Sequence, residues 1–157
     1  GRDAVTVEDR LRERGLTLPE PAAPLAAYVP FVRAGDLLHV SGQVSRDASG
    51  AVLRGTLGRD LDAAAGAEAA RSCALQLLAQ ARAACGGDWG RLLRVVKLTG
   101  FVASAPDFTD HPKVVNGASE LMVALLGDAG RHARSAVGVA ALPLGAAVEV
   151  EGVFLLR

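Results

Sequence analysis

The sequence predicts a single α+β domain in which two long helices cover one face of a mixed β-sheet. Three observations lead to this prediction. The 157 residues are enough for one hydrophobic core. Two long segments have the apolar periodicity of helices, and the segments around them alternate as strands do. Half of the residues are hydrophobic but only 4 % are aromatic, so small aliphatic side chains must form a core in which helices lie flat on a sheet.

An N-terminal extension over residues 1–27 is expected to precede the main domain at residues 28–157. Thr6 begins a Thr-Val-Glu-Asp sequence, which signals the start of a short polar helix. Three prolines within residues 19–24 then prevent regular structure and predict an extended connector. We expect the extension to pack across the domain rather than to fold by itself.

The main domain opens with strand patterns. Tyr28–Val32 and Leu37–Ser41 predict a β-hairpin with its turn at Gly35–Asp36. The polar run Ser45–Gly50 predicts a second turn, and Val52–Leu53 a short edge strand.

Two amphipathic helices follow. Asp60 is the expected N-cap of a helix that runs to about Ala84, before a Gly-Gly stop. The second helix runs from Asp107 or Asp110 to Leu126 and tolerates Pro112 only because that residue lies near the first turn. Its predicted buried stripe is Val115, Ala118, Met122 and Leu125.

Three strands complete the pattern: Leu92–Ala103 between the helices, then Ala133–Ala140 and Ala147–Leu156. Alternation in the first predicts that Val96 shares a face with Leu98 and Val102, opposite Val95, Lys97, Thr99 and Phe101. With both helices on one face, the other face of the sheet needs cover, and symmetric self-association is the usual solution.

Charge and motif content weigh against several classes of function. The 17 basic and 17 acidic residues cancel, which disfavours a nucleic-acid partner. The motifs of phosphate-binding loops, dinucleotide sites, zinc proteases and serine hydrolases do not occur. His39, His111 and His132 are far apart in the sequence, so a metal site built from them is disfavoured. We expect neither a metal nor a cofactor.

The cysteines and the hydropathy pattern favour a cytoplasmic location. The spacing of Cys73 and Cys85 matches no zinc or redox motif, and two free cysteines suit a reducing compartment. No apolar run is long enough to cross a bilayer, so no membrane partner is expected.

Arg134 stands out on a predicted strand of small residues. Its neighbours on the same face are Ala136, Gly138 and Ala140, which leave space around a guanidinium. Such an arginine is either an ion-pair partner at an interface or a clamp whose planar fork binds both oxygens of a carboxylate. The spacing alone does not decide between these two interpretations.

Glu149 and Glu151 share one face of the last strand, opposite Val148, Val150 and Phe154. One interpretation is that they form salt bridges with Arg134 or Lys97. The other is that one carboxylate orients or deprotonates a water molecule.

Three further polar residues have ordinary structural interpretations. A serine before Gly-Gln, as at Ser41, usually bonds backbone at the end of a strand. A mid-helix asparagine such as Asn116 is usually exposed, and Tyr28 is most simply a buried ring with its hydroxyl at the surface.

Several segments together resemble the RidA/YjgF family of imine deaminases. The C-terminal signature is Arg134–Val137 (Arg-Ser-Ala-Val), then Leu-Pro-Leu-Gly at Leu142–Gly145, then Val-Glu-Val-Glu at Val148–Glu151. Val-Ser-Gly-Gln at Val40–Gln43 and Val-Lys-Leu-Thr-Gly-Phe-Val at Val96–Val102 are also similar to family segments. The resemblance covers roughly Tyr28 to Phe154 in the right order.

The resemblance implies a chorismate-mutase-like fold assembled as a homotrimer, with sites in the clefts between subunits. It implies hydrolysis of 2-imino acids to 2-oxo acids and ammonia without a cofactor. The carboxylate-binding arginine of the family falls on Arg134 and the water-orienting glutamate on Glu149. The residues that line the pocket fall on Tyr28, Ser41 and Asn116.

Two departures from the family pattern concern the substrate more than the fold. The family's Gly-Pro-Tyr-Ser-Gln loop appears here as Ala-Ala-Tyr-Val-Pro around Tyr28. A position that is cysteine in some members is Ala136, which excludes thiol chemistry there. Besides the enzyme, a non-catalytic trimeric module that binds a carboxylate metabolite is a competing interpretation. The family's ribonuclease label fits the neutral charge least.

Overall fold

A computed structural model describes residues 6–24 and 26–157. Residues 1–5 and Leu25, which belong to the predicted extension, lie outside the described residues. The sheet has five strands in the order β1-β2-β5-β3-β4. β4 runs parallel to β3 and every other neighbouring pair is antiparallel, so the sheet is mixed, as predicted. The strands are β1 (Phe31–Ala34), β2 (Leu37–Val44), β3 (Leu92–Ala103), β4 (Ala133–Val139) and β5 (Val148–Leu156).

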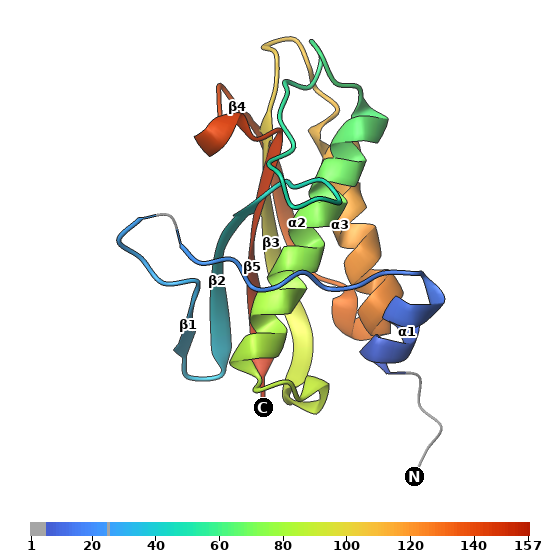
Figure 1. Ribbon diagram of the computed structural model, residues 1–157, viewed down its shortest axis with the longest axis vertical. Helices are drawn as coiled ribbons and strands as arrows, with labels where there is room; N and C mark the ends of the chain where they lie inside the picture. The colour runs from blue at the N-terminus through green and yellow to red at the C-terminus, as the bar shows by residue number, and fades with distance from the viewer. Residues whose placement is uncertain (1–5, 25) are drawn as a thin grey trace.

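The two long helices, α2 (Ala63–Ala84) and α3 (His111–Leu126), lie side by side on one face of the sheet (Figure 1). Residues 115, 118, 122 and 125 of α3 are fully buried, which confirms the predicted stripe. The helices touch at small residues: a Cβ on Gly117 would lie 1.9 Å from the backbone oxygen of Ala67. Glycine at this position therefore lets the two helix backbones approach each other closely.

The predicted N-cap of α2 is wrong by two residues. Asp62, not Asp60, is the N-cap, and its side chain accepts a hydrogen bond of 2.8 Å from the amide of Ala65. The Asp60 side chain instead accepts from the amide of Thr56 and closes the preceding turn. Two aspartates this close in sequence are equally good caps, and only the path of the loop selects between them.

Helix α1 (Val7–Glu13) starts at Thr6, as predicted, with a capping box between Thr6 and Asp9. Leu11 and Leu18 are buried in the same hydrophobic core as the long helices. Arg10 donates to the backbone oxygen of Leu125 at the end of α3, at 3.0 Å. The described part of the N-terminal segment therefore packs across the domain, as expected.

The N-terminal hairpin differs from the prediction in its bounds. β1 begins at Phe31 rather than Tyr28, because the chain bends through residues 26–30. β2 continues to Val44, beyond the predicted end at Ser41, because its pairing with β5 shifts register between Val40 and Gln43. This irregularity lets the strand resume after Gly42. Val52 makes only an isolated bridge, to Arg46, and no edge strand forms there.

β3 has its predicted bounds but a different inner face at its start. Val95 is fully buried and pairs with Phe154, whereas Val96 is only half-buried. The register shift between Val95 and Lys97 reverses the alternation at this point. From Leu98 onward the predicted alternation is confirmed, with Leu98 and Val102 on the helix side.

The face of the sheet opposite the helices carries Thr99, Phe101 and Val153, together with Val137, which is 44 % exposed. Within residues 6–24 and 26–157, no helix is both long enough and apolar enough to cross a membrane.

Candidate functional site

Arg134 lies on β4 and points toward α3. Its register partner on β3 is Leu98, which is fully buried beneath the helices, so both side chains lie on the helix side of the sheet. Nη1 donates to Oδ1 of Asn116 at 2.8 Å and to Oγ of Ser119 at 3.1 Å. Nη2 donates to the backbone oxygen of Pro112 at 3.4 Å. The structure thus brings together Arg134 and Asn116, two of the predicted site residues.

The guanidinium of Arg134 is held by neutral acceptors only. No carboxylate within the described residues lies within ion-pair distance of it, and the predicted alternative of a salt bridge with Glu149 or Glu151 is wrong within the chain. The Nε–H of Arg134 and one N–H of its Nη2 make no hydrogen bond with any of the described residues. These two donors can bind both oxygens of an incoming carboxylate.

Ser119 and His132 support Arg134 and were not identified from the sequence. Ser119 lies three residues after Asn116 and therefore on the same face of α3, so helical periodicity could have predicted that the two side chains are neighbours. Because Ser119 Oγ accepts from Arg134, its hydroxyl donates to Nε2 of His132, 2.9 Å away. The Nδ1–H of His132 then donates to Gly130 at 2.6 Å. Burial, and then the charge of Arg134, lower the pKa of His132, which favours this neutral form.

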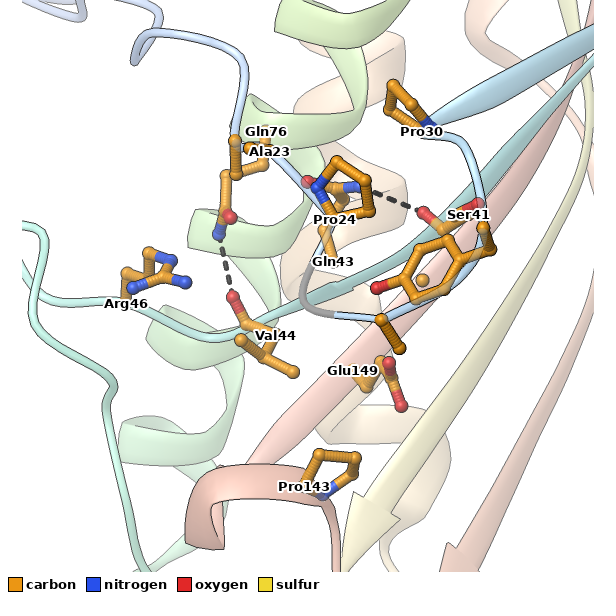
Figure 2. Close-up of a pocket in the computed structure, with 14 residues that line it drawn as sticks. Ala23, Pro24, Pro30, Ser41, Gln43, Val44, Arg46, Gln76, Pro143 and Glu149 are labelled. Carbon is orange, nitrogen blue, oxygen red and sulfur yellow. Dashed lines mark hydrogen bonds between the residues drawn. The ribbon is translucent and has the colours of Figure 1, made fainter.

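Glu149 lies on β5 beside a hollow of about 200 Å³. Figure 2 shows its carboxylate between Ser41 and Pro143. The walls of the hollow come from β2, β5, α2 and the N-terminal connector, where Gln80 of α2 holds the backbone oxygen of Ala22 at 2.9 Å. The lining includes Ala22, Pro24, Tyr28, Ser41, Gly42, Arg46, Gln76, Pro143 and Glu149.

The irregularity in β2 makes room for the Glu149 carboxylate. A Cβ on Gly42 would lie 2.6 Å from Oε1 of Glu149, so the carboxylate rests against the bare backbone of β2. Neither Glu149 nor Glu151 forms an ion pair within residues 6–24 and 26–157. Burial, and then the neighbouring charge of Glu151, raise the pKa of Glu149. The carboxyl group can therefore exchange a proton at a higher pH than an ordinary glutamate.

Ser41 and Tyr28 lie beside Glu149, on the same hollow. The hydroxyl of Ser41 donates to the backbone oxygen of Val29 at 2.7 Å, which confirms the expectation of a backbone bond and ties down the loop next to Tyr28. Tyr28 is 48 % exposed, so its interpretation as a buried ring is wrong. The bend before β1 carries the ring out of the core and to the rim of the hollow.

The two groups of residues lie on opposite faces of the sheet. Glu149 pairs with Phe101 of β3, whereas Arg134 pairs with Leu98, and these two β3 residues point in opposite directions. β3 also separates their strands within the sheet. We call them the arginine half (Arg134, Asn116, Ser119) and the glutamate half (Glu149, Ser41, Tyr28). One half can bind a carboxylate, and the other can move a proton. No group of three or more His, Cys, Asp or Glu side chains that could hold a metal occurs in the described residues.

Comparison with known proteins identifies the family. A family model described as "YjgF/chorismate mutase-like, putative endoribonuclease" matches residues 8–154, and the chain belongs to this family. The chain is 49 % identical to Protein TCP17 of Trypanosoma cruzi over 152 residues, which cover 96 % of this chain and 94 % of that protein.

Solved structures agree in fold. The protein Atu1372 of Agrobacterium tumefaciens, described as having unknown function, has a TM-score of 0.89 at 46 % identity, with coverage of 96 % of this chain and 92 % of that one. A protein of Shewanella oneidensis that carries the same endoribonuclease description has a TM-score of 0.91 at 34 % identity, with coverage of 96 % and 99 %. The chorismate-mutase-like α+β fold predicted from the sequence is thereby confirmed.

Proposed function

We propose that this chain is a cytoplasmic, cofactor-independent deaminase that hydrolyses 2-imino acids to 2-oxo acids and ammonia. The observation that carries the proposal is the state of Arg134: its charge is held in place by neutral acceptors, and one edge of its fork has no partner within the described chain. A small carboxylate is the ligand that this edge fits. The neutral overall charge gives less support to the family's endoribonuclease description.

Hydrolysis of an imine requires mainly that the substrate and a water molecule are correctly positioned. The carbon of an imine is already electrophilic, so a bound substrate and a placed water are the main requirements. In the proposed reaction, Arg134 binds the carboxylate. Glu149 takes a proton from water as the water oxygen bonds to C2. As the C–O bond forms, the C=N π electrons move to nitrogen, which takes the proton from Glu149 to give a carbinolamine. The proton of its hydroxyl then moves to nitrogen, with Glu149 as the carrier, while the C–N bond breaks and the C=O bond forms; ammonia leaves and a 2-oxo acid remains.

We propose that the two halves meet between subunits of a homotrimer. Within one chain they lie on opposite faces of the sheet, so a single copy does not combine them. The face without helices carries Phe101, Val137 and Val153 and needs cover, which self-association supplies. A site completed by a second copy would use both halves.

A coupled assay tests the activity. An amino-acid oxidase generates imines, and the release of ammonia is followed with and without the protein. Arg134→Lys keeps the charge but loses the fork, and we expect kcat/KM to fall roughly 100-fold. Arg131→Lys, at an exposed position nearby, is the matched control and should retain full activity. Binding of 2-oxo acids without acceleration of any imine would overturn the enzyme and support a carboxylate-binding module instead.

A mixing experiment tests the shared site. Arg134→Ala and Glu149→Gln should each be nearly inactive alone. After both are unfolded and refolded together in equal amounts, about a quarter of intersubunit sites would contain two intact halves. Recovery of about that fraction of activity supports sites between subunits. No recovery, with mixed oligomers confirmed by mass spectrometry, would overturn them.

A further inference from the structure

A third polar group, Ser104 with His111, lies near the arginine half and has no role in the proposed reaction. Ser104 follows β3 directly, and His111 is the first residue of α3. Ser104 Oγ and His111 Nε2 are 3.1 Å apart. Both side chains line an open hollow of about 400 Å³, together with residues 105, 106, 108 and 138–140.

Gly138 of β4 makes this pair possible. A Cβ at that position would lie 2.4 Å from Nε2 of His111 and 2.6 Å from Oγ of Ser104, so any other residue would displace both. A glycine within a strand often marks the close approach of another group. The ring of Phe108 meets the ring of His111 edge-on, with centroids 5.4 Å apart and planes at 88°, and limits its rotation. The pair is therefore held in a defined place on β4.

Ser104 and Arg134 both contact the first turn of α3, through His111 and Pro112. Arg134, Ala136 and Gly138 alternate along the same face of β4, so the methyl group of Ala136 lies between the two polar groups. Arg134 donates to Pro112 and Asn116, which follow His111 on α3. Nη2 of Arg134 lies 3.4 Å from the backbone oxygen of Pro112, the residue after His111, so the side chain of a small acid bound at Arg134 can reach the pair.

The pair can bind a group that is both donor and acceptor. If the Ser104 hydroxyl donates to Nε2, the imidazole keeps an N–H at Nδ1 as a free donor, and the serine oxygen can still accept. In the other tautomer, Nε2–H donates to the serine, whose hydroxyl becomes the free donor while Nδ1 accepts. His111 Nδ1 has no hydrogen-bond partner within the described residues. A hydroxyl or a carboxamide matches either arrangement.

We infer that Ser104 and His111 form a second subsite, which binds an uncharged hydroxyl or carboxamide at the far end of the substrate side chain. This inference rests on the proposed function, because Arg134 must hold the carboxylate at the other end. It assigns the substrate class as polar 2-imino acids rather than aliphatic ones.

Pairs of substrates with the same shape test the subsite. We would compare kcat/KM for imines of homoserine and norvaline, and of asparagine and leucine. The natural protein should favour the polar member of each pair. Ser104→Ala, and independently His111→Phe, which keeps the ring contact with Phe108, should lower the polar-to-aliphatic ratio roughly three- to tenfold. Ser49→Ala, at an exposed turn position, is the matched control for Ser104→Ala and should leave the ratio unchanged.

The outcomes separate the subsite from the activity. Arg134→Lys should lower both members of each pair alike. Activity that depends on Arg134, with a ratio that neither Ser104→Ala nor His111→Phe changes, would overturn the subsite and leave the proposed function intact. If no imine is accelerated, the proposed function fails. The same ratios, measured as calorimetric affinities for the corresponding 2-oxo acids, then support or overturn the subsite by themselves.

Discussion

The arginine half and the glutamate half are built in different ways. The arginine half uses regular elements: Asn116 and Ser119 share one face of α3, and Arg134 reaches them from β4. The glutamate half depends on irregular structure, namely the register shift in β2, the bend at residues 26–30 and the connector at residues 22–24.

The halves also differ in electrostatics, and the two differences complement each other. In the arginine half, neutral acceptors hold a cation without neutralising it. In the glutamate half, burial and Glu151 oppose the ionisation of a carboxyl that forms no ion pair within residues 6–24 and 26–157. The arginine half thus keeps a positive charge for a carboxylate ligand, and the glutamate half keeps a carboxyl group that can exchange a proton. Three substitutions test whether the two halves have these separate roles.

The largest effect is expected for Asn116→Asp. A carboxylate in place of the amide oxygen, 2.8 Å from Nη1, would pair with Arg134 and neutralise its charge. We expect the affinity for a 2-oxo acid to fall roughly 100-fold, because the ligand carboxylate then competes with an internal one. Calorimetry measures this loss. Ser119→Ala removes one acceptor without adding charge and should cost only a few-fold; an equal loss in both variants would show that charge is not what matters.

An intermediate effect is expected for Gly42→Ala. The new methyl group would lie 2.6 Å from Oε1 of Glu149, well inside van der Waals contact, and would displace the carboxylate. We expect kcat for imine hydrolysis to fall about tenfold, since the water loses its partner. The affinity for 2-oxo acids should stay within about twofold, because the arginine half is untouched. A loss of affinity with unchanged kcat would contradict this division of roles.

The smallest effect is expected for Glu151→Gln, which removes the like charge that raises the pKa of Glu149. The pKa should move down toward its ordinary value of 4.5, although burial keeps it raised. The acidic limb of the profile of kcat/KM against pH should therefore shift to lower pH, but only in part, because burial still raises the pKa of Glu149. A shift to higher pH, or the same limb in Glu149→Gln, would contradict Glu149 as the titrating group.

The same raised pKa has a consequence for stability. Between 4.5 and the raised value, the folded chain binds more protons at Glu149 than the unfolded chain does. Stability from this group is present at low pH and is lost as the pH rises through that window. Glu149→Gln should remove this slope from denaturant unfolding measured across the same range.

Periodicity was enough to predict most of the fold. The bounds of β3, the stripe of α3 and the Thr6 start of α1 follow from local patterns, and all three are confirmed. The errors occur where two readings of the same local sequence are equally good. Asp60 and Asp62 are equally good caps, and the register shifts in β2 and β3 leave no mark on a two-residue alternation.

The sequence alone determined which residues can carry the chemistry: a fork at Arg134, a carboxyl at Glu149 and the motifs around them. Tertiary structure decided where they stand. Alternation along one strand places a residue on one of two faces, but only the pairing of the strands decides which residues of different strands share a face. Arg134 pairs with Leu98 of β3 and Glu149 with Phe101, so the two side chains lie on opposite faces of the sheet. The neutral shell of Arg134 and the raised pKa of Glu149 also arise from contacts between distant segments, which no local pattern contains.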